Sequence, residues 1–392
     1  MTATAVLAAA LATGTALLTD PHDTGLRASG LHPAGREPSG ANGQWVATWT
    51  AAPVHAAPDT TRGLAGTTVR NTVHSSTGGD AARITLSNLF GTGALVVDRA
   101  RVNAHGVTFG GAGKVTVPAG GRVVSDPVTT RIAADSNLVV SFRTLTTGGH
   151  ITQHPSAFQT SYLVGPRTTW PVDDWRYLTA VDVFSTTAPG TVVAFGDSLT
   201  AGSGSTPGAN RRWPDLLSDR LRGHWGVANQ GISGNRLLSD GRGGIAGTTR
   251  FARDALGVTG VRTVIVALGI NDAQTASAHL DPQRVVDALR RLTAQGHARG
   301  LRVIGVTLTP FEGIGNYTPA REAIRQEVNE QIRAGGVFDA YVDFDAVVRD
   351  PAVPQRIRAD YDSGDHLHFN DTGYRALADS IDLGLLTGAP KG

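Results

Sequence analysis

Hydrophobic and polar residues follow two different patterns along this chain, and the change comes near residue 186. Upstream of it, short runs alternate apolar and polar residues, and glycine-rich clusters separate the runs. Short alternating strands at this spacing predict an antiparallel β-sandwich or jelly-roll-like domain. The clearest runs are residues 68–74, 82–89, 114–118 and 137–142.

Downstream of residue 186, continuous apolar runs alternate with segments whose apolar residues recur at helical spacing. The apolar runs predict buried strands, and they begin at residues 191, 263, 303 and 337. Segments 212–221 and 283–292 predict helices, and a closing helix is expected near Asp371, capped by Asn370 or by Asp371 itself. Alternating strands and helices predict a parallel sheet covered on both faces, a three-layer α/β/α domain.

These patterns divide the 392 residues into four segments. Residues 1–18 are uncharged and similar to the apolar core of a secretory signal peptide, although no basic residue precedes them and no Ala-x-Ala follows. A buried N-terminal helix is the alternative. Residues 19–43 read as a flexible linker, 44–186 as the β domain and 187–392 as the α/β domain. The expected location is therefore extracellular.

Composition excludes several classes of function. The net charge is +2 and the basic residues are scattered, so no nucleic-acid partner is expected. The chain has no cysteine, which excludes disulfides, a thiolate nucleophile and cysteine-bound zinc. His150 and His154 are four residues apart but lie in a loop or strand pattern, so no metal is expected. The sequence has no long apolar stretch, so an integral membrane protein is not expected. Nothing in the sequence indicates an oligomeric state.

Candidate chemistry gathers where the predicted strands end. The first strand stops at Gly-Asp-Ser with Ser198, and the segment 227–235 contains Gly234. Another strand ends in Gly-x-Asn-Asp with Asn271, and Asp-x-x-His near the C-terminus supplies Asp365 and His368. Parallel strands end together at one edge of a sheet, where ligands bind, so these distant residues are expected to meet there.

The four blocks together resemble the SGNH hydrolases, also called the GDSL esterase/lipase superfamily, over residues 191 to about 380. The segment ahead of them begins Trp-Val-x-Thr-Trp, as in secreted, actinobacterial-type members of that group. Residues 87–91 and 212–215 are also similar to that group, whose members include acetylxylan esterases. This resemblance implies a serine ester hydrolase without metal or cofactor.

A serine hydroxyl needs a neighbouring base, and an imidazole oriented by a carboxylate is the usual one. Spacing alone leaves both His366 and His368 open as the base. The resemblance implies His368, with Asp365 as its orienting carboxylate and Ser198 as the nucleophile.

For the oxyanion hole the resemblance implies three donors: the backbone N–H groups of Ser198 and Gly234 and the side-chain amide of Asn271. Gly234 is preferred to Gly231 because it follows Ile-Ser, as in the family block. Asp197 and Asp272 are interpreted as neighbours that brace these loops.

Other nucleophile and cofactor motifs are absent or incomplete. No Gly-x-Ser-x-Gly elbow and no Walker loop occur in the chain. Residues 241–246 formally match a dinucleotide-binding fingerprint, but no strand is predicted before them and no helix clearly after them.

The sequence therefore predicts a secreted serine esterase that acts on O-acyl groups of carbohydrates or on other small polar esters, so the partner is a small-molecule or polysaccharide substrate. A lipase or phospholipase is the alternative enzyme. A carbohydrate-binding protein with an inactive hydrolase domain is the alternative of another class. Four tryptophans ahead of residue 186 bear on this choice, namely Trp45, Trp49, Trp170 and Trp175. They belong either to the core or to a rim on which sugar rings stack, and the turn of residues 170–175 is the better candidate for such a rim.

Overall fold

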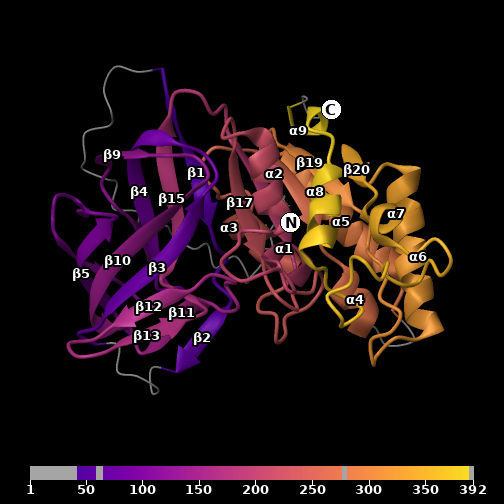
Figure 1. Ribbon diagram of the computed structural model, residues 1–392, viewed down its shortest axis with the longest axis horizontal. Coiled ribbons are helices and arrows are strands. Elements are labelled where there is room, and N and C mark those ends of the chain that lie inside the picture. Colours follow the sequence, from indigo (N-terminus) through magenta and orange to yellow (C-terminus); the bar gives the residue numbers. More distant parts are fainter. Residues whose placement is uncertain (1–41, 59–64, 276–279, 388–392) are drawn as a thin grey trace, which may run out of the picture.

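The computed structural model describes residues 42–58, 65–275 and 280–387. The predicted leader, residues 1–18, and all but the last two residues of the predicted linker lie outside the described residues. Figure 1 shows two parts side by side, a β-rich region formed by the first half of the chain and an α/β domain formed by the second.

The β-rich region contains the first fifteen strands, all paired antiparallel, and no helix among its described residues. They are β1 (Gln44–Thr50), β2 (His55–Pro58), β3 (Thr68–Ser75), β4 (Gly79–Ser87), β5 (Leu95–Val102), β6 (His105–Gly106), β7 (Lys114–Val117), β8 (Arg122–Val124), β9 (Val128–Ile132), β10 (Ser136–Thr147), β11 (His150–His154), β12 (Ser161–Val164), β13 (Thr169–Val172), β14 (Trp175–Arg176) and β15 (Leu178–Ser185).

Two sheets of this region face each other across one apolar core. The first runs in the order β1-β15-β4-β8 and the second in the order β13-β12-β3-β10-β5-β6. Val46 and Ile84 of the first sheet join Val69 and Val140 of the second in a single cluster, each with 1% of its surface exposed or less. The alternating pattern of the sequence thus produces the predicted antiparallel, sandwich-like architecture.

The α/β domain has one sheet of five parallel strands in the order β17-β16-β18-β19-β20. Its elements are β16 (Thr191–Gly196), α1 (Ser198–Ala201), α2 (Trp213–Leu221), β17 (Gly226–Gly231), α3 (Gly247–Asp254), β18 (Val261–Ala267), α4 (Ile270–Thr275), α5 (Pro282–His297), β19 (Arg302–Val306), α6 (Pro319–Ala334), β20 (Ala340–Val342), α7 (Phe344–Val348), α8 (Asp371–Asp379) and α9 (Gly384–Thr387).

Helices cover both faces of this sheet. The helices α2 and α8 pack together on one face, while α3 and α6 both contact α5 on the other (Figure 1). The strand β16, which lies between β17 and β18, is buried along its whole length, and this explains its uninterrupted apolar sequence. The predicted three-layer α/β/α architecture is confirmed.

Several helices were not predicted, namely α3, α4, α6, α7 and α9, and two of them are informative. The helix α3 begins directly after residues 241–246, where no clear helix was expected, because its N-cap, Ala246, makes no side-chain capping bond that a sequence could reveal. The helix α6 was not predicted, although Thr318 caps it and Pro319 occupies its first position, which are ordinary start signals.

The β-rich region packs against the edge strand β17 of the parallel sheet. The backbone N–H of Ala47 in β1 donates to the carbonyl of Thr259, at 3.1 Å, and Ser76 Oγ accepts from the N–H of Val227, at 2.8 Å. A side chain at Gly226 would collide with the carbonyl oxygen of Ala47. The β-rich region thus covers an edge of the parallel sheet that would otherwise be open to pairing with other chains.

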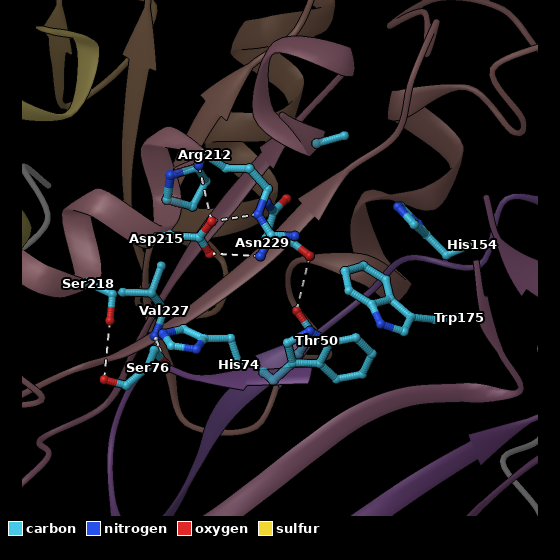
Figure 2. Close-up of a pocket in the computed structure, with 13 residues that line it drawn as sticks. Thr50, His74, Ser76, His154, Trp175, Arg212, Asp215, Ser218, Val227 and Asn229 are labelled. Carbon is cyan, nitrogen blue, oxygen red and sulfur yellow. Dashed lines mark hydrogen bonds and ion pairs between the residues drawn. The ribbon is translucent and has the colours of Figure 1, made fainter. Parts of the chain in front are cut away.

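A small polar pocket lies inside this contact between the two parts (Figure 2). His154 and Trp175 line it from the β-rich region, and Arg212 and Asn229 line it from the α/β domain. The Trp175 ring is 4% exposed, and its indole N–H donates to the carbonyl of Thr72 at 2.7 Å. The hypothesis that Trp175 belongs to a sugar-binding rim is therefore wrong, since its ring is core.

Candidate active site

Ser198 lies at the point where the buried strand β16 ends and the short helix α1 begins. Asp197 caps that helix, with Oδ1 accepting from the N–H of Leu199 at 3.0 Å. Gly196 has no room for a side chain, because a Cβ would stand 2.1 Å from Thr200 Oγ1. The turn therefore requires Gly-Asp-Ser, and it leaves Ser198 only 6% exposed at the carboxyl edge of the sheet.

His368 reaches Ser198 from a loop that precedes α8. Its Nε2 lies 2.9 Å from Ser198 Oγ, and its Nδ1 lies 2.5 Å from Asp365 Oδ2. The carboxylate only accepts, so Nδ1 carries the proton and Nε2 is left to accept the serine proton. The structure thus brings together the three residues that the sequence singled out as a triad.

The Asp365 carboxylate is fixed by its own loop. Its second oxygen, Oδ1, accepts from the backbone N–H groups of Leu367 and His368, at 3.0 and 2.8 Å. Partial burial works to raise the pKa of Asp365, but the hydrogen bonds from the His368 side chain and from the two N–H groups outweigh it and lower the pKa to about 2. Asp365 is therefore ionised throughout the range in which an imidazole titrates.

The same loop holds a second aspartate–histidine pair. Nδ1 of His366 lies 2.7 Å from Asp362 Oδ2, and His366 adopts a left-handed backbone with φ +65°. Its ring packs on Gly313, where a Cβ would stand 2.7 Å from His366 Cγ. The alternative that sequence spacing left open is thus resolved geometrically, because it is His368 that stands within hydrogen-bond distance of Ser198.

The candidate oxyanion donors come from three strand ends. Ser198 begins a helix, so its N–H has no partner within that helix. Gly234, φ +72°, sits in a tight turn closed by the hydrogen bond from Asn235 N–H to the Ile232 carbonyl, at 3.0 Å. Within the part of the chain that the structure describes, neither the Ser198 nor the Gly234 N–H has an acceptor.

Asn271 connects its own helix to this turn. One hydrogen of its side-chain Nδ2 is donated to the Asn235 carbonyl, at 3.0 Å, which leaves the other for a ligand. The neighbouring Asp272 accepts from the N–H groups of Leu237 and Leu238, at 2.7 and 2.9 Å. Asp272 thus braces the loop that follows Gly234. Gly231 is not in the turn but ends β17, against the backbone of Ala201.

A buried arginine that the sequence gave no reason to select joins these pieces from the inside. Arg250, on α3, donates to the carbonyls of Gly196 and Gln230 and to Asn235 Oδ1, at 2.7, 2.9 and 2.9 Å. Its side chain is 0% exposed, and burial lowers its pKa to about 10. The positive charge is offset by Asp254, whose Oδ2 lies 3.4 Å away. Arg250 therefore connects the end of β16 to the turn of residues 232–235 that carries Gly234, the glycine turn.

Burial also changes the chemistry of Asp197. Complete removal from water raises its pKa to about 7, and the nearby charge of Asp272 works in the same direction. Its Oδ2 has no partner among the described residues. Asp197 thus caps α1 through one oxygen and is buried, with 1% of its surface exposed.

In the described part of the chain, no cluster of three or more histidine, aspartate or glutamate side chains has the geometry to hold a metal ion. None of the described helices combines the length and hydrophobicity that a membrane span requires.

The serine, the histidine, the carboxylate and the unpaired donors all lie in a stretch of sequence that matches a known family. Residues 194–376 fit the model of the GDSL-like Lipase/Acylhydrolase family. This segment is a GDSL-like acylhydrolase domain. It contains all four sequence blocks, so the expected SGNH or GDSL membership is confirmed, and the protein is a serine ester hydrolase.

Solved structures to which this chain is similar share little sequence with it. A GDSL-like lipase from Bacteroides thetaiotaomicron VPI-5482 is 17% identical with a TM-score of 0.40, over 50% of this chain and 88% of that one. A family two carbohydrate esterase from Clostridium thermocellum, solved in complex with cellohexaose, is 15% identical with a TM-score of 0.38, over 88% of this chain and 94% of that one. No curated protein matches the sequence. Similarities this low do not assign a substrate.

Proposed function

We propose that the acylhydrolase cleaves small polar esters through a covalent acyl-enzyme. Ser198 Oγ attacks the ester carbonyl while His368 Nε2 takes the serine proton, and Asp365 holds the imidazole in the required tautomer. His368 returns the proton to the leaving alcohol. Water then attacks the acyl-enzyme with His368 as base, which releases the acid and restores Ser198. The observation that supports this mechanism is the continuous contact from Ser198 Oγ through His368 to Asp365.

We assign the oxyanion of both tetrahedral intermediates to the N–H groups of Ser198 and Gly234 and to Nδ2 of Asn271. Each donor follows a different strand end and is fixed before substrate arrives. The helix α1 fixes the Ser198 N–H, the glycine turn fixes the Gly234 N–H, and the hydrogen bond to the Asn235 carbonyl fixes the Asn271 amide. Preorganised donors of this kind stabilise developing charge without reorganisation.

The surface beside the triad favours a polar ester. The rim formed by residues 363–366 is polar and exposed. We therefore propose an O-acyl group, acetyl above all, on a carbohydrate or another polar alcohol, in a secreted protein.

The nucleophile is tested by treating the purified protein and Ser198→Ala with a serine-directed phosphonate and with p-nitrophenyl acetate. We expect stoichiometric labelling and turnover of the parent protein, and neither in the variant. A folded parent protein that neither labels nor hydrolyses any ester would contradict the mechanism.

The acyl group is tested by a chain-length series of p-nitrophenyl esters. A maximum of kcat/KM at acetate supports the proposal, and a maximum at eight carbons or longer supports a lipase. Secretion is tested separately, by N-terminal sequencing of the protein recovered from the culture medium of a secreting host.

A further inference from the structure

We propose that the β-rich region completes the oxyanion hole, because its residues 51–54 hold the glycine turn from outside. Val54 is the central positioning residue of this contact. The inference rests on the oxyanion role proposed for Gly234, and it gives the β-rich region a part in catalysis that requires no contact with substrate.

Residues 51–54, between β1 and β2, are fixed to the β-rich region. Ala51 N–H donates to the Thr179 carbonyl at 3.1 Å, and Val54 N–H donates to the Gln153 carbonyl at 3.0 Å. The carbonyl of Ala52 accepts from Nδ1 of the buried His154, at 2.7 Å. Burial lowers the pKa of His154 to about 4, so the ring is neutral at pH 7. The segment is therefore a fixed support and not a free loop.

The first contact between residues 51–54 and the glycine turn is apolar. Ala52 and Val54 form a buried cluster with Ile232 of the α/β domain, with exposures of 0%, 5% and 1%. Ile232 is the first residue of the turn that carries Gly234, and its N–H donates to the Gly196 carbonyl at 3.1 Å. A displacement of the Ile232 side chain would thus reach Gly234, whereas Gly196, next to Ser198, is also held by Arg250 at 2.7 Å.

The second contact runs through a glycine hairpin, in which Gly241 and Gly244 exchange backbone hydrogen bonds. On one side a Cβ at Gly244, φ +80°, would stand 2.9 Å from the carbonyl oxygen of Val54. On the other side a Cβ at Gly243 would stand 2.2 Å from the carbonyl carbon of Gly234, and the Gly243 carbonyl accepts from Asn235 Nδ2. The hairpin is therefore packed between Val54 and the glycine turn, with no room for a side chain at Gly243 or Gly244.

The glycine turn is consequently held from two directions. Arg250 fixes Asn235 from the interior of the α/β domain, and Val54 presses on Ile232 and on the hairpin from the β-rich region. A donor misplaced by about 1 Å in a preorganised site can cost about 100-fold in rate. Loosening the outer support should therefore lower kcat while leaving Ser198 and His368 in place.

Gly244→Ala tests the hairpin contact, because the new methyl group would push against the Val54 carbonyl. We expect kcat on p-nitrophenyl acetate to fall about 10- to 100-fold, with KM changed less than about 3-fold. Gly300→Ala is the matched control, because Gly300 has a similar φ of +68° but no atom within 4 Å of the added Cβ. It carries the same backbone strain without the contact, and its kcat should match that of the parent protein.

Val54→Ala tests the apolar contact, with Val107→Ala as its control. Val107 is also buried, at 4% exposure, but belongs to the main core of the β-rich region. Both variants should lose similar thermal stability, whereas only Val54→Ala should lower kcat, by about 3- to 10-fold. Phosphonate labelling should remain stoichiometric in both, since the nucleophile is intact.

The outcomes separate this inference from the proposed mechanism. A kcat for folded Gly244→Ala and Val54→Ala equal to that of their controls would overturn the inference. If Gly244→Ala does not fold, Val54→Ala decides alone. Absence of Ser198-dependent labelling in the parent protein would refute the mechanism itself and would be seen before any variant is compared.

Discussion

The loop of residues 362–370 contains two aspartate–histidine hydrogen bonds of similar length. Asp365 lies 2.5 Å from Nδ1 of His368, and Asp362 lies 2.7 Å from Nδ1 of His366. In each pair the backbone N–H of the histidine also donates to its aspartate. The local chemistry of the two pairs is thus nearly the same.

Their surroundings differ. The His368 side chain is 20% exposed and directs Nε2 at Ser198, whereas the His366 side chain is 55% exposed and packs on Gly313. An aspartate–histidine pair therefore becomes part of a catalytic site only when another element brings a nucleophile to the free nitrogen. Here that element is the turn from β16 to α1.

Replacing the two histidines gives the sharpest contrast. His368→Asn removes the base and should lower kcat on p-nitrophenyl acetate by about 10⁴-fold or more. His366→Asn should change kcat less than about 3-fold, because asparagine tolerates the left-handed backbone and no proton transfer is assigned to this ring. Steady-state kinetics on both variants checks the pair, and equal losses would show that the two histidines act together.

Replacing the two aspartates gives a smaller contrast of the same form. Asp365→Asn keeps a hydrogen-bonding group but loses the charge and favours the wrong imidazole tautomer, so kcat should fall about 10³- to 10⁴-fold. Asp362→Asn should retain activity within about 5-fold and lose mainly thermal stability. Comparing kcat with the unfolding temperature for each variant measures this, and a catalytic loss in Asp362→Asn without unfolding would contradict the assignment.

Asn271→Ala separates the oxyanion side of the site from the histidine side. It removes one donor, and the expected loss in kcat is about 100- to 1000-fold, less than for His368→Asn. Phosphonate labelling of Ser198 should persist, because the nucleophile and its base are untouched. Unchanged turnover in a folded Asn271→Ala protein would remove Asn271 from the oxyanion hole.

The smallest expected effect is the pH dependence that Asp365 gives to stability. Its pKa of about 2 lies below the value near 3.9 of an unfolded aspartate, so its contribution is present above pH 4 and is lost as the pH falls toward 2. Urea unfolding of the parent protein and Asp365→Asn between pH 2.5 and 5 measures it. The difference in unfolding free energy between the two proteins should shrink with acidification. His154, whose pKa is about 4, also titrates in this range, but it is present in both proteins and so does not contribute to the difference. A difference independent of pH would contradict the lowered pKa.

Much of the fold could be predicted because its signals are local. Alternation marked the strands of the β-rich region, buried apolar runs marked β16 and β18, and the cap at Asn370 marked the start of α8. Ser198, Gly234, Asn271, Asp365 and His368 could be selected because each stands in a short motif, and the four motifs together resemble the SGNH hydrolase blocks.

Other features depend on contacts between residues far apart in the chain. Trp175 read as a polar turn, but Trp49 and Thr72 enclose it. Nothing in the local sequence distinguishes Arg250 from the other arginines, but three strand and loop ends converge on its guanidinium. Burial of this kind leaves no trace in a short window of sequence, because the partner atoms come from other elements.

The sequence by itself determined the residue types that the chemistry needs and the strands that end beside them. Only the tertiary structure decided which histidine serves Ser198, what the tryptophans do and how the β-rich region meets the glycine turn. The reason is physical. A motif fixes bond geometry over a few residues, whereas the position of a nucleophile or an oxyanion donor to within an ångström is set by packing from elements up to 180 residues away along the chain, as between Val54 and Ile232.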